Sequence, residues 1–372
     1  MIMRTDWESR LERWETAGLI DAAAAAGIRA WESSQSRSRG LHWPVLLALA
    51  FGALMLAAGV ILFVSAHWDE LDSAGRLTLV VAMVAALYAG GAAVAGRFAS
   101  LSIALHTVGT VALGAGIALL AQTFQLAGHW PAEVLLWAFG AAIAWLLLGH
   151  WTQAALVAIL VPYWLAGEWW ILMKDTRVGY FAPVSAGICA LSLTYLSARR
   201  DPDDDPLRKA LAWLGGLALL PSAAITAFDW HATPPGSGRL ILGWSVAILT
   251  PFAVALTIRG RGAVWNAVAI FWSMILSALS YGRGDRILVY IWCAIGSAAL
   301  AYWGVSEARA ERINLGITGF ALTLLAFYFS SVMDKIGRSE SLIALGLLFL
   351  GGGWVLERAR RRLLSQIRPE VL

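Results

Sequence analysis

Apolar runs of roughly 20 residues recur along almost the whole chain, and they limit its fold more than any other feature. A helix of about 20 apolar residues spans the hydrocarbon core of a bilayer, which is about 30 Å thick. The composition agrees, because 59% of the residues are hydrophobic and only 14% are charged, against roughly 25% charged in soluble domains. The runs are too long for barrel strands, which alternate over about ten residues. We therefore predict an all-α integral membrane protein.

About twelve membrane-spanning helices are predicted from these runs. Their expected ranges are 44–66, 77–96, 102–121, 132–149, 151–167, 180–197, 210–228, 239–258, 263–281, 287–304, 313–331 and 339–356. The charged segment 198–209 divides them into two halves of six, 44–197 and 210–356. Its three consecutive aspartates lack the ligand spacing of a calcium loop, so we interpret it as a solvated linker. The short junction 146–153 between the fourth and fifth spans also admits a single bent segment.

The positive charges indicate how the chain is oriented. With twelve spans, 20 of the 28 Lys and Arg residues fall on the side that holds both ends. Lys and Arg collect on the cytoplasmic side, so we predict a bacterial inner-membrane protein with both termini in the cytoplasm. One span fewer would separate the basic tail 357–372 from the N-terminal arginines, which favours separate fourth and fifth spans. The net charge of +4 then reflects topology and attraction to anionic lipid, and it requires no nucleic acid.

The first 43 residues precede the first span and carry a helical pattern of their own. Large apolar residues follow helical spacing on either side of Gly18 and Asp21, which we predict to end one helix and to cap the next. These apolar residues are Trp7, Leu11, Trp14, Ala24, Ile28 and Trp31. We predict a cytoplasmic helical hairpin over 1–43 that packs through its tryptophans. Its balanced charges argue against a DNA-reading helix-turn-helix, so a protein partner or the membrane bundle is the expected contact.

No signature of catalysis or of a cofactor is present. The motifs H-E-x-x-H, G-x-S-x-G and G-x-x-x-x-G-K-[ST] are all missing from the sequence. No predicted span carries Asp, Glu, Lys or Arg near its middle, where such residues mark proton relays and coupled-ion sites. The two cysteines fall inside predicted spans and indicate neither a disulfide framework nor a thiolate metal site. We therefore expect no enzymatic activity and no cofactor.

Polar and aromatic residues inside the spans have structural interpretations. Interhelical hydrogen bonds are the expected role of His106, Gln122, Gln153, Asn266 and Asn314. Tryptophans near predicted span boundaries, Trp169 among them, are expected to anchor the chain at headgroup depth. Deeper tryptophans, such as Trp244 and Trp272, are candidates to line a cavity for a ligand. Pro162, Pro221 and Pro251 are expected to kink their helices.

The predicted outer loops gather the remaining polar side chains. Loops 64–76 and 122–133 are consecutive on that face, so we expect them to lie close together. Their polar and aromatic candidates are His67, Trp68, Asp69, Gln122, Gln125, His129 and Glu133. Imidazole and carboxylate ligands suit zinc, but no fixed helical spacing unites them, and loops at a membrane surface are polar in any case. We predict a binding or structural cluster, with an interfacial corner as the simpler interpretation.

Five stretches near the two ends of the chain have a familiar form. They are LERWETAGLID (11–21), GVILFVSAHWDEL (59–71), AQTFQLAG (121–128), RINLGITGFALTLLAFYF (312–329) and GLLFLGGGWVLERARRRL (346–363). Together they resemble an uncharacterised bacterial family of multi-pass membrane proteins, domain-of-unknown-function family 2157. The resemblance implies no catalytic residue and no known substrate. His67 and Phe327 stand where the family suggests asparagine and arginine, which weakens a metal or charge-relay site.

Two segments of the sequence resemble each other, and the predicted architecture suggests two functional hypotheses. VSAHWDEL and FSSVMDKI both leave a span on the predicted outer side, and they align Asp69 with Asp334. A repeated hairpin of this kind favours a structural role for the motif. The first hypothesis is transport or binding of a lipid or small molecule, based on two halves with proline-containing spans. The second is a non-catalytic scaffold that docks a protein partner through 1–43, and an enzyme acting at the outer loops ranks third.

Overall fold

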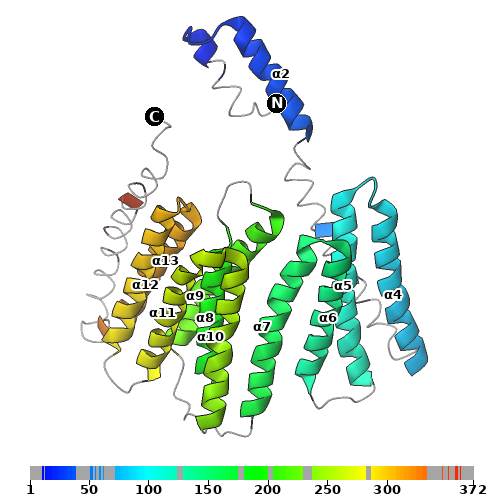
Figure 1. Cartoon of the computed structure of the whole chain (residues 1–372), viewed down its shortest axis with the longest axis vertical. Coiled ribbons are helices and arrows are strands. Elements are labelled where there is room, and N and C mark those ends of the chain that lie inside the picture. The colour runs from blue at the N-terminus through cyan, green and yellow to red at the C-terminus, as the bar shows by residue number, and fades with distance from the viewer. Residues whose placement is uncertain are drawn as a thin grey trace. The chain divides into compact units, whose positions relative to one another are not determined.

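A computed structural model of the chain contains helices and no strand over the residues that it describes (Figure 1). Those residues are 11, 13–38, 51–52, 55, 58–59, 62, 72–123, 129–174, 180–199, 204–228, 237–281, 286–332, 346, 351, 357–358 and 361. The elements are α2 Ala22–Ser38, α4 Ser73–Val94, α5 Ala99–Thr123, α6 Trp130–Leu148, α7 Trp151–Met173, α8 Ala182–Leu196, α9 Pro206–Phe228, α10 Ser237–Arg259, η2 Gly260–Gly262, α11 Ala263–Tyr281, α12 Ile287–Ser306, α13 Ala310–Phe327 and the π-helix η3 Tyr328–Val332. Within these ranges the all-α prediction is confirmed.

Helices α4 to α13 lie where the second to eleventh spans were predicted. Among the described residues, eight stretches are long and apolar enough to cross a membrane, and one of them, Gly238–Ser280, contains both α10 and α11. Helix α8 is apolar but has only 15 residues, fewer than the about 20 that a perpendicular crossing needs. The predicted spans 44–66 and 339–356 lie outside the described part of the chain, apart from isolated positions. The total of twelve membrane spans therefore stays a prediction.

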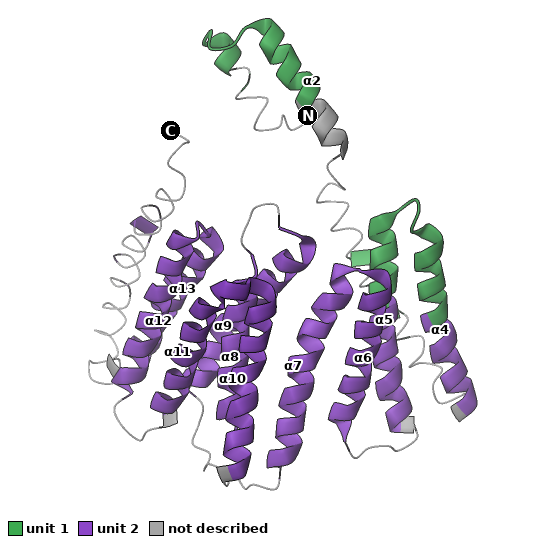
Figure 2. Cartoon of the chain, in the orientation of Figure 1, with its two compact units in different colours: residues 1–70, 85–108 green, residues 71–84, 109–372 purple. Residues whose placement is uncertain are grey.

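The chain divides into two compact units (Figure 2). Unit 1 comprises Met1–Glu70 and Ala85–Val108, and unit 2 comprises Leu71–Val84 and Gly109–Leu372. The predicted division at the linker 198–209 stays a prediction.

The N-terminal segment of unit 1 shows the two signals expected at its turn. Gly18 has a φ of 68°, a conformation that favours glycine. The carboxylate of Asp21 accepts a hydrogen bond of 2.6 Å from the backbone N–H of Ala24, in the first turn of α2. Arg29 pairs with Glu15 across this turn at 2.8 Å. The predicted end and cap are confirmed, whereas a hairpin over all of 1–43 stays a prediction.

Packing in this segment differs from the prediction. Leu11 and Ala25 are the buried apolar residues, at 1% and 0% exposure. Trp14 and Trp31 are exposed at 48% and 59%. Trp14 and Trp31 are therefore not packed between the helical segments as predicted, and Trp7 lies outside the described residues.

His106 is the main buried polar residue in the other part of unit 1. Its side chain is 3% exposed, and its Nδ1 lies 3.3 Å from the Ser102 hydroxyl one turn earlier in α5. The imidazole also makes an edge contact with Tyr88 of α4. A Cβ at Gly91 would lie 2.8 Å from the imidazole. Glycine at this position therefore allows α4 and α5 to approach at the histidine.

Helices α6 and α7 of unit 2 form a tight antiparallel pair. Gly149 ends α6 with a φ of 66°, and its N–H donates to the Trp145 carbonyl before α7 begins at Trp151. Val134, Ala141 and Leu160 lie in the apolar core between the two helices. The junction that was open to a single bent segment is thus two separate helices.

Helix α8 is the central element of unit 2, since it packs against α7, α9, α10 and α11. Ten of its 15 residues are buried, and most of these are alanine, serine or another small residue that allows close helix approach. A Cβ at Gly215 of α9 would collide with the α8 backbone at Ser192 and Leu196. Gly187 of α8 gives a similarly close approach to Ala247 of α10.

Two of the predicted interhelical hydrogen bonds are present in unit 2. The Thr110 hydroxyl of α5 donates to the fully buried Gln153 of α7 at 2.9 Å. The amide of Asn266 in α11 donates to the Ser197 hydroxyl, which follows α8, also at 2.9 Å. Each pair satisfies polar atoms that would otherwise be unpaired in an apolar interior.

Candidate functional site

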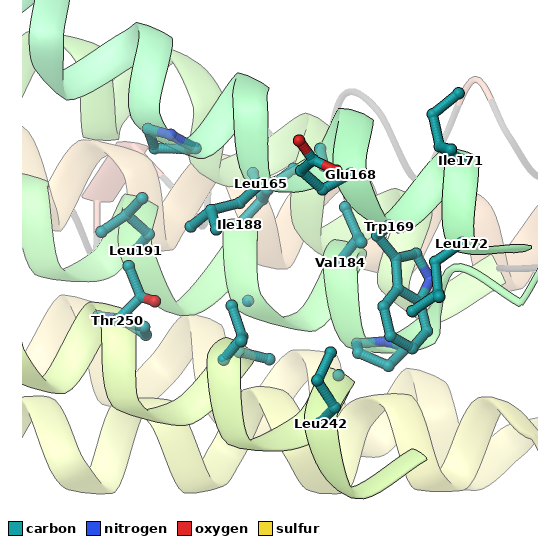
Figure 3. A pocket seen from close by; sticks show the side chains of 18 of the residues that line it. Leu165, Glu168, Trp169, Ile171, Leu172, Val184, Ile188, Leu191, Leu242 and Thr250 are labelled. Carbon is teal, nitrogen blue, oxygen red and sulfur yellow. The ribbon is translucent and has the colours of Figure 1, made fainter. Parts of the chain in front are cut away.

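An apolar cavity of about 370 Å³ lies between α7, α8 and α10 of unit 2 (Figure 3). Its walls are Pro162, Leu165, Ala166, Glu168, Trp169, Ile171 and Leu172 of α7, Pro183, Val184, Gly187, Ile188 and Leu191 of α8, and Leu242, Gly243, Val246, Ala247, Thr250 and Pro251 of α10, with His129 before α6. Leu242 and Val246 are also exposed, at 55% and 37%. The cavity therefore borders the apolar surface of α10, where acyl chains of a bilayer would lie.

Two prolines in the cavity wall change the backbone hydrogen bonding of their helices. Pro162 has no N–H, so the Ala158 carbonyl one turn earlier loses its helical donor. The Tyr195 hydroxyl of α8 replaces that donor at 2.9 Å. Pro251 in α10 likewise leaves the Ala247 carbonyl without a helical donor. The Ala247 carbonyl is therefore a polar backbone position in a helix that faces the cavity, whereas helices otherwise bond their carbonyls internally.

Trp169 forms a large part of the cavity wall and packs inside the protein, since its side chain is only 5% exposed. Its expected position at headgroup depth stays a prediction. Its indole N–H donates to the Tyr180 carbonyl at 2.6 Å, between α7 and α8. Gly243 of α10 lies directly against the indole ring, because a side chain at this position would collide with the ring. Packing by a neighbouring helix, which hydropathy does not reveal, therefore draws this tryptophan inside.

A histidine and a glutamate pair at one end of the cavity. His129 Nε2 lies 2.9 Å from Glu168 Oε1, and the Trp164 indole donates to the same oxygen at 2.9 Å. His129 is 47% exposed and Glu168 35% exposed, so both groups lie partly at the surface of the protein. Helix α7 continues to Met173, beyond the predicted end at 167. The prediction stopped too early because the acid was taken as a loop residue, whereas Trp164 binds it one helical turn away.

Thr250 supplies a polar atom in the apolar lining (Figure 3). Among the described residues, no partner accepts or donates a hydrogen bond at its hydroxyl. Thr194 and Thr226, in neighbouring helices, instead donate to the carbonyl four residues earlier. A small number of polar groups in an apolar lining is typical of ligand sites, where they fix the orientation of the ligand.

The structure describes three residues of the predicted outer cluster. Gln122 is exposed in the last turn of α5, His129 precedes α6, and Glu133 is half-buried in the first turn of α6. His129 pairs with Glu168 of α7, a contact that the sequence analysis did not foresee. Within the described ranges, no three His, Cys, Asp or Glu side chains are placed to hold a metal ion. The remaining members, His67, Trp68, Asp69 and Gln125, lie outside the described residues, so the cluster stays a prediction.

The proposed repeat and the deep tryptophans also have partial outcomes. Asp334 lies outside the described residues, but Ser330 of the same motif forms a 2.6 Å hydrogen bond with the Tyr290 hydroxyl of α12. Trp272 donates to the Trp292 carbonyl, and Trp292 donates to the Trp272 carbonyl. Neither Trp272 nor Trp244 lines the cavity between α7, α8 and α10. The tryptophan in that wall is Trp169.

Comparison with known proteins identifies a family over part of the chain. Residues 12–154 match the model of a family described as "Predicted membrane protein (DUF2157)". The resemblance inferred from the sequence is thereby confirmed for this segment. No curated protein and no solved structure matches the chain.

Proposed function

We propose that the protein binds a lipid or another largely apolar small molecule in the cavity between α7, α8 and α10, and that it transports such a molecule. The observation that carries the proposal is an apolar cavity of about 370 Å³ whose polar groups are few and lie apart, at Glu168 and Thr250. Ligand pockets typically have volumes of roughly 300–1,000 Å³ and a mainly apolar lining. An elongated molecule with one polar end fits this distribution, because its polar end can meet the water-exposed pair at Glu168.

The proposed ligand can enter from the bilayer. Leu242 and Val246 belong both to the cavity wall and to the exposed surface of α10. Pro162 and Pro251 interrupt backbone hydrogen bonding in the two helices that face each other across the cavity. Proline-interrupted helices accompany substrate sites in transporters, so the same feature supports movement of one helix against the other.

The test is retention of a copurifying molecule by protein purified in mild detergent. In Val184→Phe, a larger side chain occupies the cavity. Val268→Phe makes the same change on the exposed surface of α11, where the valine is 57% exposed. We expect native mass spectrometry to detect a bound lipid or metabolite on the wild type and on Val268→Phe, but much less on Val184→Phe. Equal retention by all three proteins would remove the basis for the cavity site.

The distribution of positive charge supports a specific orientation of the chain in the membrane. Three of the loops predicted to be cytoplasmic contribute Arg199, Arg259 and Arg309 to one end of the helices in unit 2. We propose on this basis that both termini are cytoplasmic in a bacterial inner membrane. Labelling of single cysteines introduced at the termini, in intact and permeabilised cells, tests the orientation directly.

A second function has a specific observation in its favour. Four large apolar side chains of the N-terminal segment are exposed, namely Trp14, Leu19, Ile28 and Trp31. Exposed apolar patches of this kind occur at protein interaction sites, so we also propose docking of a protein partner through 1–43. Deletion of 1–40 should then remove a specific copurifying protein and leave the melting temperature of the membrane bundle unchanged. An identical pull-down from the truncated protein would contradict the docking function.

A further inference from the structure

A dense group of charges lies at the ends of α8, α10 and α12 in unit 2, away from the cavity lining. We call it the arginine cluster, and it consists of Arg199, Arg259, Arg309, Arg312, Glu307 and Glu311. Arg199 follows α8, Arg259 ends α10, and the others lie in or beside the turn between α12 and α13. Arg312 is fully buried, and Arg309 is only 6% exposed. Neither the cavity nor the family match assigns a role to this group.

Glu307 is the carboxylate at the centre of the arginine cluster. Its Oε1 accepts from Arg259 at 2.6 Å, and its Oε2 accepts from Arg312 at 2.6 Å. The Trp303 indole also donates to Oε1 at 2.6 Å. Burial raises the pKa of Glu307, but the hydrogen bonds from the two arginines and the indole outweigh burial and lower the pKa to about 2. Glu307 is therefore fully ionised at neutral pH, and both of its oxygens are in use.

Trp303 and backbone carbonyls complete the contacts of the buried arginines. The Trp303 ring lies under the guanidinium of Arg312, with 4.6 Å from Cζ to the ring centroid. Arg312 donates to the Arg199 carbonyl at 3.0 Å, and Arg259 to the Ser197 carbonyl at 3.3 Å. The Ser197 carbonyl caps the C-terminal end of α8, which carries partial negative charge, and the Arg199 carbonyl follows two residues later. Dipoles of this kind reduce the repulsion between the guanidinium groups, but they add no full negative charge.

Positive charge exceeds negative charge in the arginine cluster. Within the described part of the chain, the cluster contains four arginines and two glutamates, and Glu311 Oε1 lies a long 3.6 Å from Arg199 Nη1. In each of the four arginines the buried Nε–H has no hydrogen-bond acceptor. Among the described residues, the Arg309 side chain has no ion-pair partner at all. One carboxylate oxygen of the cluster, Glu311 Oε1, is also buried without a hydrogen-bond partner. A buried charge without a partner costs several kcal/mol, and with four arginines against two glutamates a further anion would offset the excess of positive charge.

We propose that the arginine cluster binds a phosphate group, with Arg309 as its main ligand. Guanidinium groups match the oxygens of phosphate with paired N–H donors, and several converging arginines favour a phosphate over a single carboxylate. Arg199 and Glu307 are 32% and 25% exposed, which gives the cluster an edge at which the ligand enters. The phosphate belongs either to an anionic phospholipid or to a soluble molecule. Basic pockets between helix ends bind anionic headgroups in other membrane proteins.

The site is independent of the proposed cavity function, and the test uses full-length protein in detergent. The melting temperature is followed during titration with phosphatidylglycerol, with inorganic phosphate and with diacylglycerol, which has the same chains but no phosphate. Arg309→Gln removes the proposed ligand. Arg239→Gln is the matched control, because Arg239 is an exposed arginine in the first turn of α10 and its partner is the Leu172 carbonyl. Arg309→Lys keeps the charge but loses the paired donors.

Three results are expected if the site binds phosphate. Phosphatidylglycerol raises the melting temperature and diacylglycerol does not, whereas a comparable rise with inorganic phosphate identifies a soluble ligand as the source. Arg309→Gln binds about tenfold more weakly than the wild type, since hydrogen bonds to charged groups have effects of this size. Arg309→Lys falls between them, and Arg239→Gln binds like the wild type.

Two results would overturn the proposal. One is a wild-type melting temperature that neither phosphate compound raises above the value in diacylglycerol. This comparison needs no variant, so it holds even if Arg309→Gln fails to fold. The other is an equal response of Arg309→Gln and Arg239→Gln to phosphatidylglycerol, which would show attraction by net charge alone.

Discussion

Helices α8 and α10 have two very different ends. Near Val184 and Leu242 they border an apolar cavity, and the pair of His129 and Glu168 at that cavity is 47% and 35% exposed. Near the ends of the same helices, Arg312 is fully buried and its partner Glu307 is 25% exposed. Water screens the first pair and is largely excluded from the second, so the two pairs differ in strength although both have short contacts.

The polar groups at the two ends differ in how firmly their neighbours fix them in place. In the arginine cluster, Glu307 accepts hydrogen bonds from three side chains. Without its carboxylate, the buried guanidinium groups of Arg259 and Arg312 would lose their ion-pair partner. At the cavity, the carboxylate of Glu168 is 35% exposed, so it can exchange partners more readily. We infer that the arginine cluster fixes the positions of helix ends, whereas the cavity end has the freedom that binding a variable ligand requires.

The largest expected effect is that of Glu307→Gln. The change leaves Arg259 and Arg312 buried without a carboxylate, and we expect about 2–3 kcal/mol of lost stability at pH 7. The pKa of Glu307 is lowered from 4.5 to about 2 in the folded protein. Its stabilising effect is therefore complete above about pH 4.5 and declines as the pH falls toward 2. Melting curves of wild type and variant in detergent should converge over that range.

The control for this substitution is Glu311→Gln. Glu311 is 33% exposed and lies 3.6 Å from its partner, so we expect a loss below about 1 kcal/mol. Equal losses in the two variants would contradict the distinction between the buried and the exposed members of the cluster.

A second prediction concerns the packing of α8 near the arginine cluster. Gly215→Ala would place a methyl group against the α8 backbone at Ser192 and Leu196, and we expect a loss of about 1–3 kcal/mol. Gly216→Ala is the neighbouring control, since its Cβ would lie 3.5 Å from the Leu315 side chain, an ordinary contact. The control should be neutral or slightly stabilising, because alanine favours helices. Similar melting temperatures for the two variants would show that α8 and α9 are less tightly packed.

The smallest effect is expected at the cavity end. His129→Gln removes the exposed pair with Glu168, which retains the Trp164 indole as a donor. We expect a stability change within about 0.5 kcal/mol, measured by the same melting assay at pH 7. A loss as large as that of Glu307→Gln would remove the contrast between the two ends.

The helices could be predicted from the sequence because apolar runs have the length of a membrane crossing. Helices α4 to α13 follow this signal, and Gly149 ends α6 as a glycine after a helix is expected to do. The end of α7 was missed because Glu168 and two tryptophans follow Gly167, a pattern that is also typical of a span boundary. Hydropathy does not reveal that the Trp164 indole donates a hydrogen bond to the Glu168 carboxylate within α7.

The sites were less predictable, since they depend on contacts between distant residues. Arg259 and Glu307 are 48 residues apart in the sequence, and His129 and Glu168 are 39 apart. Counting positive charges identified the loops that carry Arg199 and Arg259, but not that these arginines pair with Glu311 and Glu307. Thr250 and Trp169 gave only weak signals, because threonine and tryptophan are common in membrane helices. The spacing of four residues between Trp164 and Glu168 is compatible with their hydrogen bond within one helix.

The central claim is that the space between α7, α8 and α10 holds a ligand. Electron cryo-microscopy of the wild-type protein in lipid nanodiscs tests it most directly. The account predicts elongated density between Leu242 and Val184, in contact with the indole of Trp169 and with one end near Glu168. A structure in which α7 and α10 close on each other, with side chains filling the space and no such density, would contradict it.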